Sequence, residues 1–146
     1  MNRIFIFTLL IFSAFSVSAQ QWNLSLETAK SKAEKEGKNI VLCFSGSDWC
    51  IPCMKLEKTI WESPEFIEYS NAHFVLLRAD FPKKKANALS KEQQAQNDRL
   101  AEIYNKQGAF PSVLVLDKIG KILGATGYKN LAPKEYIALL HSFESK

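Results

Sequence analysis

The chain carries the motif Trp49-Cys50-Ile51-Pro52-Cys53 between a continuous apolar run and a segment with helical periodicity. The run at 39–45 (NIVLCFS) is rich in β-forming side chains, which predicts a buried strand. From 50 to about 63 apolar residues recur at helical spacing, and Pro52 suits a first helical turn, where a missing N–H is harmless. The chain is therefore expected to leave a buried strand, cross a short loop and start a helix at two closely spaced cysteines.

This position of the cysteine pair predicts redox chemistry. The free N–H groups and the positive dipole end at a helix N-terminus favour a thiolate at Cys50. A thiolate is the species that attacks a disulfide, and Cys53, one helical turn further on, can then resolve the mixed disulfide. Such a pair cycles between a dithiol and a disulfide, so Cys50 and Cys53 are the candidate catalytic residues.

Two other uses of a CxxC pair remain as alternatives. A zinc site needs two further Cys or His ligands at suitable spacing, whereas Cys43, His73 and His141 form no second paired motif. We therefore predict no metal ligands. A purely structural disulfide is the second alternative, and the position of the motif between a strand and a helix argues against it.

The first 19 residues have the pattern of a secretory signal peptide. A basic start is followed by an almost wholly apolar stretch at 4–15 and by the small residues Val17-Ser18-Ala19, after which cleavage is expected. The stretch is shorter than the ~20 residues of a membrane span, which disfavours an uncleaved anchor. No Cys for lipid attachment follows the cleavage site. The predicted mature chain, 20–146, is then periplasmic or secreted, where disulfides persist.

Length and composition favour one α/β domain. Cleavage leaves 127 of the 146 residues, enough for one hydrophobic core, and a formal charge of +4 is too mild to suggest a nucleic-acid binder. The remaining elements are expected to be helices between Ser25 and Gly37, at 64–70, from Ser90 to Gly108 and from Pro133, and strands at 73–80, 112–116 and 121–125. Together these elements predict a mixed sheet of about four strands flanked by helices. In the helix after Ser90, the residues expected to point inward are Ala95, Leu100, Ile103 and Tyr104.

A second motif, Gly108-Ala109-Phe110-Pro111-Ser112, precedes the predicted strand at 112–116. A proline that follows an aromatic residue directly before a strand predicts a cis-proline turn. With both motifs, the chain resembles the thioredoxin superfamily: WCIPC and GAFPS match its active-site motif and its cis-proline loop, in the same order and on the same elements. The resemblance spans about residues 24–143. VLCFSGSDWCIPC is similar to small exported thioredoxin-like proteins and to the periplasmic domain of transmembrane electron carriers.

The resemblance implies a thioredoxin-like fold and a reaction. Cys50 is implied to be the nucleophile and Cys53 the resolving cysteine, and a cis Pro111 would lie against the pair and help to present backbone to an extended substrate segment. Protein disulfides or dithiols would be the partners. The sequence has no nucleotide-binding fingerprint. We therefore expect no cofactor, and a membrane electron carrier is the expected donor for a reductase.

Other residues of the two motifs are implied to support the site. Trp49 would shield the cysteines and offer an apolar platform, and Ile51 and Pro52 help to set the redox potential. For Trp49 and Phe110, direct substrate contact and ordinary packing remain equally open.

The sequence also departs from thioredoxin. Thioredoxin carries a buried Asp on the strand before its motif, where this chain has Cys43 and Phe44. Glu57, one helical turn beyond the motif, is a candidate substitute in proton transfer, although a solvated Glu is the simpler interpretation. Cys43 is expected to be a buried core residue rather than a third functional thiol. The run Lys83–Lys85 is expected to be a solvated loop tip rather than a docking patch for an acidic partner.

These observations favour an exported thiol–disulfide oxidoreductase that exchanges disulfides with proteins, more as a reductase than as an oxidase. Two alternatives of other classes stay open. One is a non-enzymatic binding module on the same fold, with idle cysteines, and the other is a Cu(I)-handling protein that binds the metal through thiolates. The mature chain is expected to be soluble and monomeric.

Overall fold

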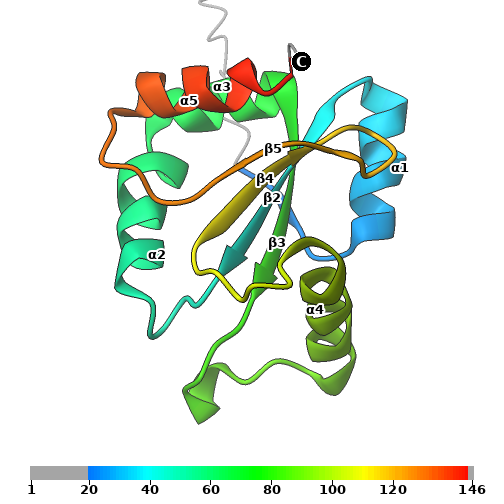
Figure 1. Cartoon of the computed structure of the whole chain (residues 1–146), viewed down its shortest axis with the longest axis vertical. Helices are drawn as coiled ribbons and strands as arrows, with labels where there is room; N and C mark the ends of the chain where they lie inside the picture. The colour runs from blue at the N-terminus through cyan, green and yellow to red at the C-terminus, as the bar shows by residue number, and fades with distance from the viewer. Residues whose placement is uncertain (1–19, 145–146) are drawn as a thin grey trace, which may run out of the picture.

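The computed structural model describes residues 20–144, so the signal peptide predicted at 1–19 lies outside the described residues. Five strands form one mixed sheet in the order β1-β3-β2-β4-β5 (Figure 1). In chain order they are β1 (Trp22–Asn23), β2 (Asn39–Ser45), β3 (Phe74–Asp80), β4 (Ser112–Leu116) and β5 (Ile122–Thr126). The α/β architecture is as predicted, but the sheet has five strands rather than four. The added strand, β1, has only two residues and owes its place to parallel pairing with Leu76 and Leu77 of β3.

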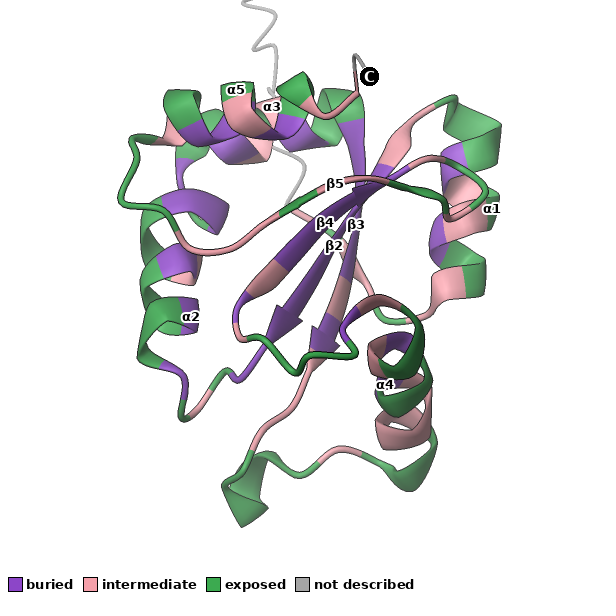
Figure 2. Cartoon of the chain, viewed as in Figure 1, coloured by how far each residue is buried: buried purple, intermediate pink, exposed green. Residues whose placement is uncertain are grey.

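Strand β2 lies at the centre of the sheet. It pairs in parallel with β3 over its whole length, from Asn39 opposite Phe74 to Ser45 opposite Asp80, and antiparallel with β4. Every residue from Ile40 to Ser45 is buried, as expected for a strand that is covered on both faces. Figure 2 shows this buried centre of the sheet. The parallel pairing brings the carboxyl ends of β2 and β3 to the same edge, where the cysteine motif begins.

Helices cover both faces of the sheet. They are α1 (Leu26–Glu36), α2 (Ile51–Leu56), α3 (Pro64–His73), α4 (Lys91–Tyr104) and α5 (Pro133–Ser142). Helices α1 and α4 lie on one face, and α2, α3 and α5 on the other (Figure 1). Successive residues of β2 serve the two cores in turn, since Leu42 and Phe44 belong to the α1 and α4 side and Val41 and Cys43 to the opposite side.

The segment after the cysteine motif differs from the single helix predicted up to about residue 63. Helix α2 ends at Leu56 and continues as a π-helix, η1 (Glu57–Trp61), closed by a 2.9 Å hydrogen bond from Glu62 N to Glu57 O. The wider turn inserts an extra residue, and the consecutive side chains of Ile60 and Trp61 are both buried. Helix α3 then runs on to His73, which the sequence places in the next strand.

Helix α4 differs from the prediction in which of its residues face the sheet. Ile103, predicted to point inward, is 58% exposed, whereas Asn97 is 2% exposed. Asn97 donates to Asp80 O and accepts from the Gln93 amide, both at 2.8 Å, so its burial is compensated. With Asn97 and Leu100 facing the sheet, Ile103 lies on the solvent side of the helix.

Trp61 is the centre of the aromatic core on the α2, α3 and α5 side. Its ring is 1% exposed, and its centroid lies 5.7 Å from that of Trp22, 4.5 Å from Phe66 and 5.6 Å from Tyr136. Such aromatic pairs stabilise a fold beyond the area that they bury. One side chain of η1 therefore joins β1, α3 and α5.

We expect Trp61→Ala to lower the free energy of unfolding by about 3–5 kcal/mol, because it removes a fully buried aromatic ring and leaves a cavity. The measurement is urea unfolding of the oxidised protein. Ile119→Ala is the matched control, since Ile119 is 71% exposed, and its effect should stay within about 0.5 kcal/mol. Similar losses in both variants would contradict the assigned core.

Candidate active site

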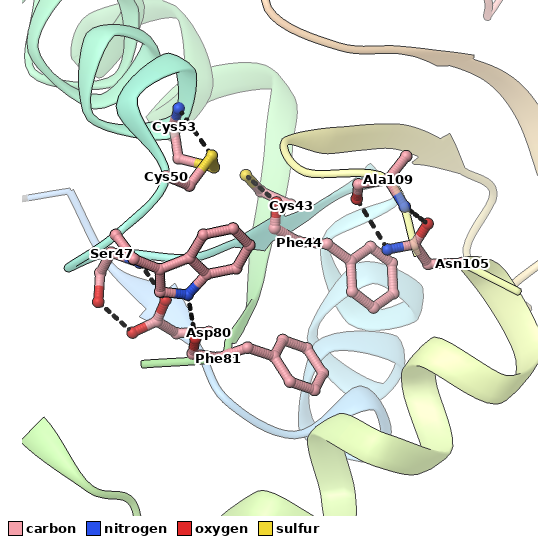
Figure 3. The surroundings of a disulfide bond; sticks show 10 residues. Cys43, Phe44, Ser47, Cys50, Cys53, Asp80, Phe81, Asn105 and Ala109 are labelled. Atoms are coloured by element: carbon pink, nitrogen blue, oxygen red, sulfur yellow. Dashed lines mark hydrogen bonds between the residues drawn. A yellow bond between two sulfur atoms is a disulfide. The ribbon is translucent and has the colours of Figure 1, made fainter. Parts of the chain in front are cut away.

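The two cysteines of the motif form a disulfide at the start of α2 (Figure 3). Their Cα atoms lie 5.2 Å apart. Cys50 takes the N-cap position in an extended conformation, and its Sγ accepts a hydrogen bond from Cys53 N at 3.2 Å. Pro52 lies in the first turn, as predicted. A helix N–H thus points at the Cys50 sulfur, which favours a negative charge there once the pair is reduced.

The pair is almost fully enclosed. Cys50 is 4% exposed and Cys53 is 3% exposed. The first turn of α2 encloses the Cys50 sulfur. This sulfur forms the disulfide with Cys53 Sγ and accepts the hydrogen bond from Cys53 N. The bordering residues are open, because Ile51 is 64% and Trp49 36% exposed, and Pro52 is exposed as well. A partner would meet an apolar rim around a recessed disulfide.

Trp49 is held in place by contacts with two other loops. Its Nε1 donates to Phe81 O at 2.7 Å, and its ring meets Phe110 edge-on with centroids 5.4 Å apart. A Cβ on Gly46 would overlap the indole, so the glycine leaves room for the ring. Trp49 and Phe110, predicted to contact substrate or to pack, pack against each other, and any contact with substrate stays a prediction.

A carboxylate at the end of β3 orders the loop before the motif. Asp80 accepts hydrogen bonds from the backbone N–H of Ser47 at 2.9 Å and from its hydroxyl. Next to it, Phe81 N donates to Ser45 O at 2.8 Å, and Asn97 binds the Asp80 carbonyl from α4. The part played by Asp80 was not predicted from the sequence, where its local signal is an acidic residue at the end of an apolar strand.

Asp48, directly before Trp49, binds the loop between β3 and α4. Its carboxylate oxygens accept from the backbone N–H groups of Lys83 and Lys84 and from Asn87 Nδ2, each at 2.9 Å. These hydrogen bonds, that of Lys83 foremost, lower the pKa of Asp48. The loop contains one 3-10 turn, η2 (Lys85–Asn87). The predicted basic loop tip therefore lies beside the cysteine motif.

The second motif contains the predicted cis peptide bond, between Phe110 and Pro111. The loop that leads to it is fixed by Asn105, whose side chain donates to Ala109 O at 2.9 Å and accepts from Ala109 N at 3.0 Å (Figure 3). Asn105 is 8% exposed, so these bonds satisfy a buried amide. The Phe110 ring in turn meets Phe81 with centroids 5.5 Å apart, and the two motifs share one aromatic cluster.

A pocket of about 430 Å³ opens beside Cys53, and most of the side chains that line it are polar or charged. Its lining includes Glu57 from η1 and Arg78 from β3. Glu57 Oε2 lies 2.7 Å from Arg78 Nη2, and the guanidinium also stacks over the Trp22 ring at 4.2 Å from its centroid. Glu57 therefore forms an ion pair with an arginine and is not simply solvated. This arginine was not predicted as part of the site. Its part in proton transfer stays a prediction.

Cys43 is a buried free thiol, as predicted. It is 2% exposed on the central strand, between Arg78 of β3 and Val113 of β4. Burial is the main cause that raises the pKa of Cys43 to about 12, and Arg78 opposes this effect. A thiol in such surroundings stays protonated and is a poor nucleophile at neutral pH.

Within residues 20–144, no group of three or more His, Cys, Asp or Glu side chains is arranged to hold a metal ion. No helix in the same range combines the length and the apolar character that crossing a membrane requires.

The sequence and the structure of the chain are both similar to those of known proteins. Residues 26–144 match the family of thioredoxin-like domains. The chain is 33% identical over 122 residues to "Disulfide bond reductase DsbH" of Chlamydia pneumoniae, across 84% of this chain and 71% of the relative. A solved structure of a DsbH oxidoreductase is similar with a TM-score of 0.81 and 30% identity, over 94% of this chain and 93% of that chain. A thioredoxin from Thermus thermophilus shares the fold at a TM-score of 0.63 and 16% identity, over 86% and 87% of the two chains.

In the oxidised protein, we expect the Cys43 thiol to react with an aromatic disulfide reagent only when the protein unfolds. Because folding raises its pKa from 9.0 to about 12, the protonated thiol stabilises the folded state below about pH 9, and this contribution is lost between about pH 9 and 12. The measurement counts the thiols that react at neutral pH, with and without guanidinium chloride. Cys43→Ala is the control that should show none in either condition, and fast labelling of the folded protein would contradict the assignment.

Proposed function

Because the chain belongs to the family of thioredoxin-like domains and is a thiol–disulfide oxidoreductase, we propose that it is exported and reduces disulfide bonds of other proteins. The observation that carries the proposal is the Cys50–Cys53 disulfide at the N-terminus of α2, which is the oxidised state of a dithiol that could act as reductant. The similarity to a protein named a disulfide bond reductase supports the direction of electron flow.

The reaction uses both cysteines of the reduced protein in turn. The Cys50 thiolate attacks one sulfur of the substrate disulfide, forms a mixed disulfide with it and releases the other substrate sulfur as a thiolate. Cys53 then loses its proton and attacks Cys50 Sγ, which releases the second substrate thiol. Two electrons have passed to the substrate, and the protein is left with the disulfide that the structure contains.

The surroundings of the pair support a substrate that lies across the two motifs. The exposed side chain of Ile51 and the half-open ring of Trp49 offer apolar contacts beside the cysteines, and Phe110 and Pro111 form the cis-proline loop next to Trp49. We assign these residues to substrate binding, with Pro111 positioning the backbone of an extended segment. Pro52 shapes the first turn, where it fits without loss of a hydrogen bond.

A further turnover needs a donor that returns two electrons to Cys50 and Cys53. We propose a membrane electron carrier with its own dithiol, because the chain has no nucleotide-binding fingerprint. The proposal includes a signal peptide at 1–19 and a mature domain at 20–146 that works in the periplasm or outside the cell.

The reduction potential of the Cys50–Cys53 pair tests the function. We expect a value of about −270 mV, at the thioredoxin end of the range, as suits a reductant of protein disulfides. The measurement equilibrates the protein in dithiothreitol and glutathione buffers and counts the free thiols. A value of about −120 mV would identify an oxidant instead, and no reversible couple would favour a binding module.

Substitution of each cysteine separates the two roles. We expect Cys50→Ala to lose all disulfide exchange, because it lacks the attacking thiolate, and Cys53→Ala to accumulate a mixed disulfide between Cys50 and the substrate. Non-reducing electrophoresis and mass spectrometry detect the adduct. Unchanged turnover in either variant would overturn the mechanism, and Cys43→Ala, which keeps the pair, is the control.

A further inference from the structure

The loop between β3 and α4, residues 81–90, carries three consecutive lysines and is called the lysine loop below. Lys83, Lys84 and Lys85 are all exposed, and no ion pair within the described residues includes any of them. Figure 1 shows the loop projecting beyond the carboxyl ends of β2 and β3, at the end of the molecule where α2 begins. The three ammonium groups are therefore available to a partner that approaches this end.

Hydrogen bonds of the two residues that precede Cys50 connect the lysine loop to the cysteine motif. Asp48 binds the backbone N–H groups of Lys83 and Lys84, and Trp49 Nε1 donates to the backbone carbonyl of Phe81. Because these hydrogen bonds involve backbone atoms of the loop, they fix its position without using the side chains of the lysines. The backbone that carries the lysines is thus fixed against the residues that precede Cys50.

One of the three charges lies directly on the rim of the site. Lys83 Nζ is 3.9 Å from the centroid of the Trp49 ring, within the range of a cation–π contact. Two exposed apolar side chains, Ile51 and Met54, also lie on helix α2 next to the cysteines. The surroundings of the disulfide therefore combine a lysine ammonium group with exposed apolar side chains.

We propose that the lysine loop is a docking surface for acidic segments that flank the disulfide of a protein partner. The inference rests on the proposed function, because it names the feature by which the reductase selects its substrates. A partner whose Asp or Glu residues lie beside its cysteines brings negative charge to Lys83–Lys85 as its disulfide reaches Cys50. Complementary charge acts chiefly on the rate of encounter, and salt screens it over about 8 Å at physiological ionic strength.

The test compares two synthetic peptides that share one internal disulfide and differ only in two flanking residues, Asp in one and Lys in the other. The mature protein is first reduced and freed of reductant, so that each turnover passes two electrons from its dithiol to the peptide disulfide. At low ionic strength, we expect the acidic peptide to be reduced about tenfold faster than the basic peptide. The two rates should approach each other at about 0.5 M NaCl.

A pair of double variants separates the lysine loop from the net charge of the protein. Lys84→Glu with Lys85→Glu reverses two charges and leaves Lys83 on the Trp49 ring. The hydrogen bond between residue 84 and Asp48 is kept, because it comes from the backbone N–H. We expect it to abolish or invert the preference. Lys118→Glu with Lys121→Glu changes the net charge equally, at exposed positions around the turn between β4 and β5 at the opposite end of the sheet, and should keep the wild-type ratio.

Each outcome bears on one proposal. Equal rates for the two peptides with the wild-type protein, or equal loss of preference in the two double variants, would overturn the docking surface and leave the reductase proposal standing. Failure of the wild-type dithiol to reduce either peptide would instead count against the proposed function. Melting temperatures of both variants, compared with the wild type, show that the mutated chains are folded.

Discussion

The double pairing of β2 is the constraint on which the site depends. The strand is buried from Ile40 to Ser45 and is paired on both edges, so a slip in register by one residue would exchange the side chains that pack into the two cores. Its register with β3 sets Ser45 opposite Asp80, and its register with β4 sets Phe44 opposite Ser112. The cysteine motif, the lysine loop and the cis-proline loop consequently all meet at one edge of the sheet.

Polar side chains hold the loops that follow the strands in place. Beyond the ends of the strands, the backbone makes no hydrogen bonds to a neighbouring strand. There, Asp48, Asp80 and Asn105 each bind the backbone of a loop instead. Hydrogen bonds to carboxylates are stronger than those between neutral groups. The loops around the cysteines are thus positioned by a few charged and amide groups, and the aromatic rings of Trp49, Phe81 and Phe110 pack between them.

Local patterns in the sequence predict β2 and β4 at their observed bounds and α1 between its caps, Ser25 and Gly37. The comparisons confirm the thioredoxin-like fold that the two motifs indicate. What the sequence misses depends on partners far along the chain. Strand β1 exists only through β3, and the Asp48 carboxylate binds residues 35 and 36 positions away. The burial of Asn97 follows from the Asp80 carbonyl. Such groups cannot be paired from periodicity, because their hydrogen bonds form only once the sheet is assembled.

The buried thiol of Cys43 also decides which bridges this protein can form. Sulfur exchange proceeds through the thiolate, and burial raises the pKa of Cys43 to about 12, so this thiol stays protonated at neutral pH. The protonated Cys43 thiol is therefore a poor competitor in exchange with the bridge between Cys50 and Cys53. The fold therefore selects one of the pairings that its three cysteines allow. Burial of the third thiol thus favours the Cys50–Cys53 bridge over other pairings each time that the pair is oxidised.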